Sequence, residues 1–244
     1  MAFHHRNFIY NEERGFIFAY VPKVACTNWK ALLRLIAGYP DWLDNRLAHD
    51  VVNGGLRYLD LEGPDSDLLD DPAIRKYTMV RDPYSRVLSA YLNKFDYLLS
   101  VEPTTENELY FHKVLRGMDR FRREELDEET YPEISFPVFL QWVKSKPSPD
   151  AEDEHWMPQA LMLRQPDVHF DIVGKFENLA EDSARILSAM GCDQAFPSQE
   201  DVRFAPTGAS DKIAQYYTPA AYALVNELFS EDFAIFDYPM RNRT

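Results

Sequence analysis

The residues most able to do chemistry in the first part of the chain are Lys23, Thr27 and Asn28. They follow a short apolar segment, residues 16–21, that ends at Pro22, and this pattern predicts a buried strand. A helical pattern begins directly after them. A lysine, a hydroxyl group and the N–H groups of a helix start would then meet at the carboxyl end of a strand, which is an arrangement that binds anions, most often phosphate.

This motif alone does not decide the function. The ordinary phosphate loop has the sequence G-x-x-x-x-G-K-[ST], whereas residues 22–28 contain no glycine. A strand, turn and helix in which Lys23 is only solvated and Thr27 only caps the helix explains the pattern equally well. A functional interpretation therefore requires a second site of the same kind.

A second strand-to-helix turn lies around Arg81. The four residues before it predict a short apolar strand, Asp82 is a good N-cap, and Pro83 falls at the first helical position, where a missing N–H group does no harm. Arg81 at the strand end and Ser89 on the polar side of the helix predict a second anion cradle.

Helices and strands must position these groups. Residues 29–36 carry apolar side chains at helical spacing, with Lys30 and Arg34 on the opposite side, and this predicts an amphipathic helix. Residues 170–176 predict another buried strand. Together the segments predict an α/β fold with a parallel sheet that binds one ligand through two separate phosphate-type groups.

The remaining segments are less regular. No strand is predicted before Gly15, and residues 39–75 are interpreted as loops and short helical turns. The length of 244 residues and the hydrophobic content of 45% allow a full core, and we expect one domain over residues 1–244.

Charge and composition limit the partners. The 40 acidic and 26 basic residues give a formal net charge of −14, which repels nucleic acid and anionic lipid. The basic run at residues 116–123 is followed at once by acidic residues, so it is interpreted as a solvated helix face. The two cysteines, Cys26 and Cys192, predict neither a disulfide framework nor a zinc site. No apolar run approaches the ~20 residues that span a bilayer, and no signal peptide is recognisable.

Six segments carry a resemblance to a known family. The segments PKVACTNWK and VRDPYSRVLSAYLNKF resemble the sulfotransferase superfamily, and in particular the carbohydrate sulfotransferases of the chondroitin, dermatan and HNK-1 type. The segments AHDVVNGGLRYLD, DEHWMPQ and FDIVGKFENLAEDSARIL continue the match. So does the closing helix, YALVNELFSEDFAIFDYP, and the resemblance covers nearly the whole chain, with residues 96–131 matching least.

The resemblance implies a P-loop-like three-layer fold, with a central parallel sheet between helices, and a nucleotide donor. The donor is 3′-phosphoadenosine 5′-phosphosulfate (PAPS), the product is 3′-phosphoadenosine 5′-phosphate (PAP), and no metal is implied. The residues assigned to the 5′-phosphosulfate are Lys23, Ala25, Cys26, Thr27 and Asn28. Those assigned to the 3′-phosphate are Arg81 and Ser89. The acceptor is implied to be a hydroxyl group of a glycan or of another molecule.

Transfer of a sulfuryl group needs charge stabilisation and a base. Lys23 is expected to stabilise the negative charge on the leaving phosphate oxygen. The acceptor hydroxyl needs a group that is unprotonated near pH 7, and histidine meets this requirement most readily. We favour His49, which lies between the two donor motifs, while His155 and Trp156 are expected to line the acceptor side, with Trp156 stacking on a sugar.

Several alternatives stay open at this point. Each histidine could instead be a hydrogen-bonded structural residue, and Glu154 or Asp153 could be the base. A P-loop kinase-like phosphotransferase would use ATP and Mg²⁺, and a non-catalytic protein could bind PAP alone. The eukaryotic members carry a membrane anchor and extra cysteines that this sequence does not show, so we expect a cytoplasmic protein rather than a luminal Golgi domain, with its acceptor and oligomeric state unassigned.

Overall fold

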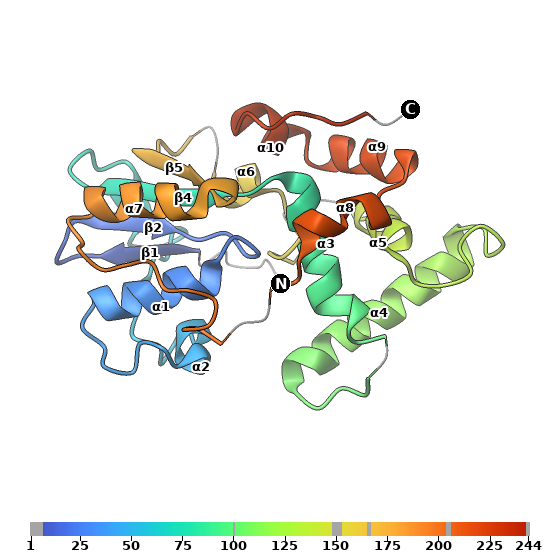
Figure 1. The fold of residues 1–244 in the computed structure, drawn as a ribbon, viewed down its shortest axis with the longest axis horizontal. Coiled ribbons are helices and arrows are strands. Elements are labelled where there is room, and N and C mark those ends of the chain that lie inside the picture. The colour runs from blue at the N-terminus through green and yellow to red at the C-terminus, as the bar shows by residue number, and fades with distance from the viewer. Residues whose placement is uncertain (1–6, 100, 148–152, 165–166, 204–205, 243–244) are drawn as a thin grey trace. The chain divides into compact units, whose positions relative to one another are not determined.

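The computed structural model describes residues 7–99, 101–147, 153–164, 167–203 and 206–242. The chain divides into two compact units (Figure 1). Residues 2–81 and 159–206 form the first, here called the sheet unit. Residues 82–158 and 207–244 form the second, here called the helical unit. Each unit is described by itself, and the single domain expected from the sequence stays a prediction.

The sheet unit is built around five strands in the order β3-β1-β2-β4-β5. The strands are β1 (Phe8–Asn11), β2 (Phe16–Ala19), β3 (Arg57–Tyr58), β4 (Arg75–Val80) and β5 (Ile172–Lys175). β2, β4 and β5 are parallel, with Phe18 opposite Tyr77 and Thr78 opposite Val173. This confirms the predicted parallel arrangement of three strands, namely the one before Pro22, the one before Arg81 and the one over residues 170–176.

The sheet is mixed, however, and not parallel throughout. β1 pairs antiparallel with both β2 and β3, although no strand was predicted before Gly15. β1 and β2 form a hairpin in which Gly15 adopts a φ of 64°, a conformation that glycine tolerates without strain. β1 has only four residues, and its two buried ones, Phe8 and Ile9, are too few to establish a period of two.

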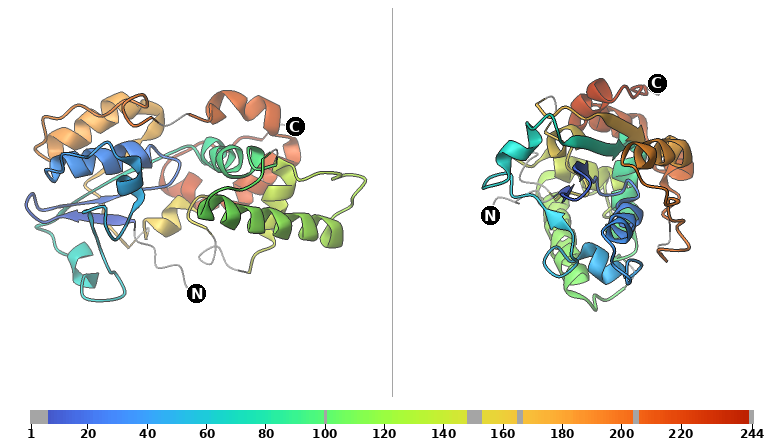
Figure 2. Two further views of the ribbon diagram at one scale, coloured as in Figure 1. Left: turned by 90° about the horizontal axis from the view of Figure 1, so that it is seen from below. Right: turned by 90° about the vertical axis from the view of Figure 1, so that its left-hand side faces the viewer.

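Two helices cover one face of this sheet, namely α1 (Cys26–Ile36) and α7 (Leu179–Ala189). Phe18 stacks on Trp29 of α1, with ring centroids 4.3 Å apart. Tyr77 is paired with Phe18, so it points to the same face, and its hydroxyl donates to the carbonyl oxygen of Ala189 at 3.1 Å. Both helices therefore lie on the same side of the strands, as the two views in Figure 2 show. The α/β class with helices beside the sheet is confirmed.

The helix α1 is buried on more sides than its sequence predicts. Lys30 and Arg34, expected on a solvated face, are only 4% and 1% exposed. The Lys30 ammonium lies 3.7 Å from the ring centroid of Tyr20, and Arg34 pairs with Asp41 and with the carbonyl of Gly54. The segment after α1 folds back over this side, so both cations are held by specific partners.

Short elements complete the sheet unit. They are α2 (Asn45–His49), η1 (Ser66–Leu69), α6 (Gln159–Met162) and η4 (Phe176–Asn178). The expectation of loops and helical turns over residues 39–75 is confirmed in part, because this range also contains β3 and most of its remainder is irregular. α2 begins at an N-cap, Asp44, whose side chain accepts from the N–H of Arg46.

The helical unit is formed by six α-helices and one π-helical turn among its described residues. They are α3 (Pro83–Tyr91), η2 (Leu92–Asp96), α4 (Glu106–Glu125), α5 (Phe136–Lys144), α8 (Ala209–Tyr216), α9 (Pro219–Leu228) and α10 (Ser230–Ile235). The predicted start of α3 is confirmed, with Pro83 at its first position and Asp82 accepting from the N–H of Ser85 at 3.1 Å. The basic run at residues 116–123 is a solvated face only in part. Arg116, Arg120 and Arg123 are exposed, as expected, whereas Arg122 is 8% exposed and pairs with Asp119 at 2.9 Å.

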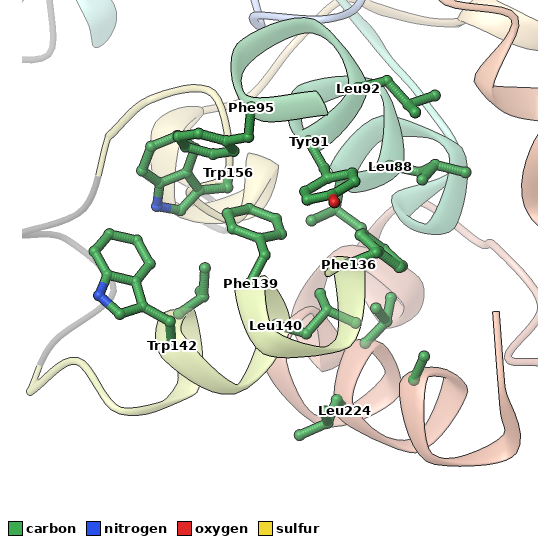
Figure 3. Packing of buried hydrophobic residues seen from close by; sticks show 14 of the residues in the cluster. Leu88, Tyr91, Leu92, Phe95, Phe136, Phe139, Leu140, Trp142, Trp156 and Leu224 are labelled. Atoms are coloured by element: carbon green, nitrogen blue, oxygen red, sulfur yellow. The ribbon is translucent and has the colours of Figure 1, made fainter. Parts of the chain in front are cut away.

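An aromatic cluster fills the core of this unit (Figure 3). Tyr91 and Phe95 of α3 and η2 pack against Phe139 of α5, and Trp156 closes the cluster. Trp156 is 1% exposed and contacts the rings of Phe95, Phe139 and Trp142. The expectation that Trp156 stacks on a sugar is therefore wrong, because its indole is buried among other aromatic rings of the core.

Candidate functional site

The turn between β2 and α1 has an unusual backbone. Lys23 has a φ of 71° and Ala25 a φ of 50°, and both values lie in the left-handed region that favours glycine. Each such residue costs roughly 1 kcal/mol or more relative to an ordinary conformation. Strained residues of this kind persist where the surroundings fix them, and they concentrate at ligand-binding turns.

The start of α1 leaves its first N–H groups without a capping side chain. Ala25 is the N-cap, and its methyl group cannot accept a hydrogen bond. The carbonyl of Ala25 accepts from the N–H of Trp29 at 3.0 Å, which begins the helical ladder. No acidic residue lies in the first turn. The positive end of the helix dipole and the first amides therefore favour an anion at this position.

Arg81 joins the second motif to the first. β2 and β4 are adjacent and parallel, so their carboxyl ends lie side by side. Arg81 follows directly after β4, and its Nη1 donates to the carbonyl oxygen of Lys23 at 2.9 Å. The guanidinium also lies 4.4 Å from the ring centroid of Phe176, and the residue is 6% exposed. Arg81 and the backbone of Lys23, which were predicted from separate motifs, thus meet at the carboxyl ends of β2 and β4.

His49 contacts the same turn from α2. Its Nε2 lies 3.0 Å from Oγ1 of Thr27, and the tautomer of the ring decides which atom donates. His49 is exposed, whereas Thr27 is 6% exposed at the start of α1. The contact exists because α1 and α2 pack together, which brings residues 22 positions apart in the sequence into hydrogen-bond range.

Asn28 holds a neighbouring loop. Its Nδ2 donates to the carbonyl oxygens of Pro197 and Ser198 at 3.0 and 3.2 Å. Asn28 also lines a cavity of about 720 Å³ that lies between α7 and the loop at residues 191–199. Cys26, the first residue of α1, is half-buried and free of any disulfide.

The helical unit contains the other predicted residues. Ser89 on α3 is 3% exposed, and its Oγ lies 3.0 Å from Oγ1 of Thr207. His155 forms a hydrogen-bonded pair with the carboxylate of Asp153 through its Nδ1. Burial lowers the pKa of His155, the Asp153 carboxylate opposes this shift, and the Lys94 ammonium adds to it, so that the net shift is downward.

The pKa of Asp153 is also lowered, but for another reason. Burial works to raise its pKa, but the hydrogen bonds and charge of His155 outweigh this effect and lower it. The pair therefore combines an ionised carboxylate with a neutral imidazole near pH 7. A carboxylate that holds Nδ1 of a histidine fixes the tautomer and leaves Nε2 as the basic nitrogen.

A comparison with protein families matches a model of the sulfotransferase family to residues 6–239. The chain belongs to the sulfotransferase family. The match covers the donor-type turn at Lys23, the residue Arg81 and both histidine segments. The resemblance stated from the motifs is thereby confirmed.

This chain has curated relatives that are carbohydrate sulfotransferases. It is 29% identical to human carbohydrate sulfotransferase 14 over 98% of its own length and 62% of the relative's length. Mouse carbohydrate sulfotransferase 11 is 26% identical, with 97% of this chain and 68% of the relative covered. Human carbohydrate sulfotransferase 8 is 27% identical, with coverages of 98% and 56%. The chain thus spans about three fifths of the first of these relatives. No solved structure matches it significantly.

The fold places most of the predicted site residues in one unit. The predicted residues in the sheet unit are Lys23, Ala25, Cys26, Thr27, Asn28, His49 and Arg81. Ser89 and His155 belong to the helical unit. Sequence reasoning did not single out Phe176, whose ring lies against Arg81, or Gln159, whose amide bonds to the backbone of Arg81. The only feature of the sequence that could have pointed to Phe176 and Gln159 is that both lie in segments that resemble the family.

No group of three or more histidine, cysteine or acidic side chains in the described part of the chain could hold a metal ion. Among the same residues, no helix has the length and apolar character that crossing a bilayer requires.

Proposed function

We propose that this chain is a PAPS-dependent sulfotransferase that moves a sulfuryl group to a hydroxyl of a carbohydrate. The observation that carries the proposal is the 2.9 Å contact between Arg81 and the carbonyl of Lys23, which unites the two anion-binding motifs in one place. The relatives that are carbohydrate sulfotransferases support a carbohydrate acceptor.

The donor fits the chemistry of this turn. PAPS carries a phosphosulfate and a separate 3′-phosphate, so it needs cations and N–H donors at two points. The proposed contacts to the phosphosulfate come from Lys23, Ala25, Cys26, Thr27 and Asn28, and those to the 3′-phosphate come from Arg81 and Ser89. The left-handed turn and the uncapped start of α1 supply backbone donors without a metal. In this respect the turn acts as a P-loop-like cradle.

The proposed reaction is an in-line transfer. The S–O bond to the donor phosphate breaks while a new S–O bond forms to the acceptor oxygen, and the electron pair of the broken bond stays on the phosphate. The Lys23 ammonium stabilises this growing negative charge. The proton of the acceptor hydroxyl passes to a base that is neutral near pH 7.

His49 is the proposed base, and His155 is the alternative. The hydrogen bond between His49 and Thr27 supports the first assignment, because it ties the imidazole to the donor turn. The pairing of His155 with Asp153 supports the second, because the carboxylate directs Nδ1 and leaves Nε2 basic. Under the first assignment His155 contributes to acceptor binding.

The proposal is tested by donor binding and by transfer. PAP at millimolar concentration with EDTA present should raise the melting temperature, whereas ATP with Mg²⁺ should raise it less. Radiolabelled PAPS should then transfer its label to at least one member of a panel of glycans and simple sugars. An unchanged melting temperature with PAP contradicts the donor assignment. If PAP binds but no hydroxyl compound accepts the label, the chain is a PAP-binding protein and not an enzyme.

A further inference from the structure

Gln159 is the final residue of the segment DEHWMPQ and the first residue of α6. Its exposed fraction is 0%. The side-chain amide makes two hydrogen bonds to a single residue, Arg81. Its Oε1 accepts from the N–H of Arg81 at 2.9 Å, and its Nε2 donates to the carbonyl oxygen of Arg81 at 2.8 Å. Both backbone polar groups of Arg81 are thus held by one side chain.

This contact lies where the sheet stops. Arg81 directly follows the last residue of β4, and a buried backbone beyond the end of a strand must find new partners for its N–H and carbonyl groups. The planar amide of Gln159 offers one acceptor and one donor side by side, as the peptide of a neighbouring strand would. Two bonds to one residue fix the orientation of its backbone as well as its position.

The side chain of Arg81 depends on that backbone. From this position the guanidinium reaches the carbonyl of Lys23 and the ring of Phe176. The contacts therefore run from Gln159 to Arg81 and on to Lys23, and all of these residues lie within the sheet unit. A shift of the Arg81 backbone would move its guanidinium away from Lys23 and disturb the strained turn.

Few other side chains can bond to both the N–H and the carbonyl group of the Arg81 backbone. A methionine of similar length has neither a strong donor nor a strong acceptor, and a glutamate near pH 7 can accept from the N–H but cannot donate to the carbonyl. Loss of the amide would leave buried polar groups of Arg81 without partners, which is unfavourable. The choice of glutamine matches the requirement for one donor and one acceptor.

We propose that Gln159 is a positioning residue for the donor, which acts by holding the backbone of Arg81 so that its guanidinium faces the bound nucleotide. The inference rests on the proposed function, because it assumes that Arg81 binds PAP. Gln159 touches neither the donor nor the reacting atoms, and its effect passes through Arg81 alone.

A double-mutant cycle on PAP affinity tests this pathway. The dissociation constant of PAP is measured by calorimetry for the wild type, Gln159→Met, Arg81→Ala and the double variant, each well below its melting temperature. Gln159→Met should weaken PAP by about tenfold or more, which is the effect of one lost charge-assisted contact. In the Arg81→Ala background the same change should have almost no further effect, because the guanidinium that it positions is absent. Additive losses would overturn the inference.

A control separates positioning from general stability. Tyr77→Phe removes a buried hydrogen bond from the same strand, at its contact with α7, and leaves Arg81 untouched. It should lower the melting temperature without changing the affinity for PAP. If Tyr77→Phe weakens PAP as much as Gln159→Met does, the effect is one of stability and the inference is wrong.

A second variant covers the case in which the first does not fold, and the wild type separates a failure of the proposed function from a failure of the inference. If Gln159→Met does not fold, Gln159→Glu takes its place in the cycle, since its carboxylate still accepts from the N–H of Arg81 and loses only the donor. Gln159→Glu should weaken PAP binding less than Gln159→Met does. In the Arg81→Ala background it should again have almost no further effect. A wild type that does not bind PAP overturns the proposed function and this inference together. A wild type that binds PAP, with additive variants, overturns the inference alone.

Discussion

His49 lies 3.0 Å from the hydroxyl of Thr27, so the only histidine of the sequence between Lys23 and Arg81 contacts the first turn of α1, where the proposed donor site begins. The contact joins α2 to α1 within the sheet unit. It gives the proposed base a fixed neighbour among the residues assigned to the donor, and it leads to the first prediction.

His49→Ala should abolish transfer while PAP still binds, because the variant loses the proposed proton acceptor and keeps the cations. The kcat of the wild type should fall at low pH, because a protonated imidazole cannot take the proton of the acceptor hydroxyl. His155→Ala should mainly raise the KM for the acceptor. Both variants are assayed with saturating PAPS. The opposite pattern assigns the base to His155, and full activity in both points to a carboxylate, with Glu154 tested first.

Replacement of Lys23 should separate chemistry from binding. Lys23→Met keeps the length of the side chain and removes its charge, so kcat should fall by roughly 10²-fold or more, whereas the affinity for PAP should change much less. Lys23→Arg keeps the charge and serves as the matched control, with a smaller loss. Steady-state kinetics and PAP titration give the two quantities. A higher KM for PAPS with an unchanged kcat would make Lys23 a uniform binding contact.

Ala25→Gly should stabilise the folded chain. The φ of 50° at Ala25 costs roughly 1 to 2 kcal/mol for a residue with a Cβ, and glycine removes this cost while adding about 0.5 to 1 kcal/mol of unfolded-state entropy. We expect a net gain of up to about 1 kcal/mol in the free energy of unfolding, measured by urea denaturation. Ala31→Gly, at a buried position within α1 where φ is helical, should instead lower this free energy and serves as the control. A loss of stability in Ala25→Gly would show that the turn is not strained.

The free energy of unfolding should depend on pH through His155. Because its pKa is lower in the folded chain than in the unfolded chain, the unfolded chain binds the additional proton below about pH 6.5. Stability contributed by the neutral imidazole is therefore present above this pH and decreases as the pH falls toward the folded-state pKa. The pKa of Asp153 is also lowered in the folded chain, so its ionised carboxylate contributes stability as well. This contribution is lost in more acidic solution, as the pH falls below the ordinary pKa range of an aspartate.

Urea denaturation between pH 7.5 and 5.5 tests this dependence. His155→Gln should show a flatter decrease than the wild type over this range, since glutamine has no proton to gain. The difference between the two curves isolates His155 from the other histidines. Parallel curves for the two proteins would contradict the lowered pKa.

The sequence determined those features that are local in the chain. The apolar run before Pro22, the N-cap at Asp82 and the proline at position 83 specified two strand-to-helix turns, and the structure has both. Local signals work here because a cap, a turn and a helix start each depend on residues within a few positions of one another. The residue types in these turns also indicated an anion ligand before any family was considered.

Tertiary structure alone decided which distant segments meet. Gln159 and Arg81 are 78 positions apart, and no spacing in the sequence reveals that an amide from one holds the backbone of the other. Trp156 was placed wrongly because its position beside His155 does not show which segments cover the indole. Helical periodicity put Lys30 opposite the apolar side of α1, but it could not show that other segments bury this side too. The strand β1 escaped prediction because four residues gain their stability from pairing with neighbours on both sides, which is a property of the sheet and not of the segment.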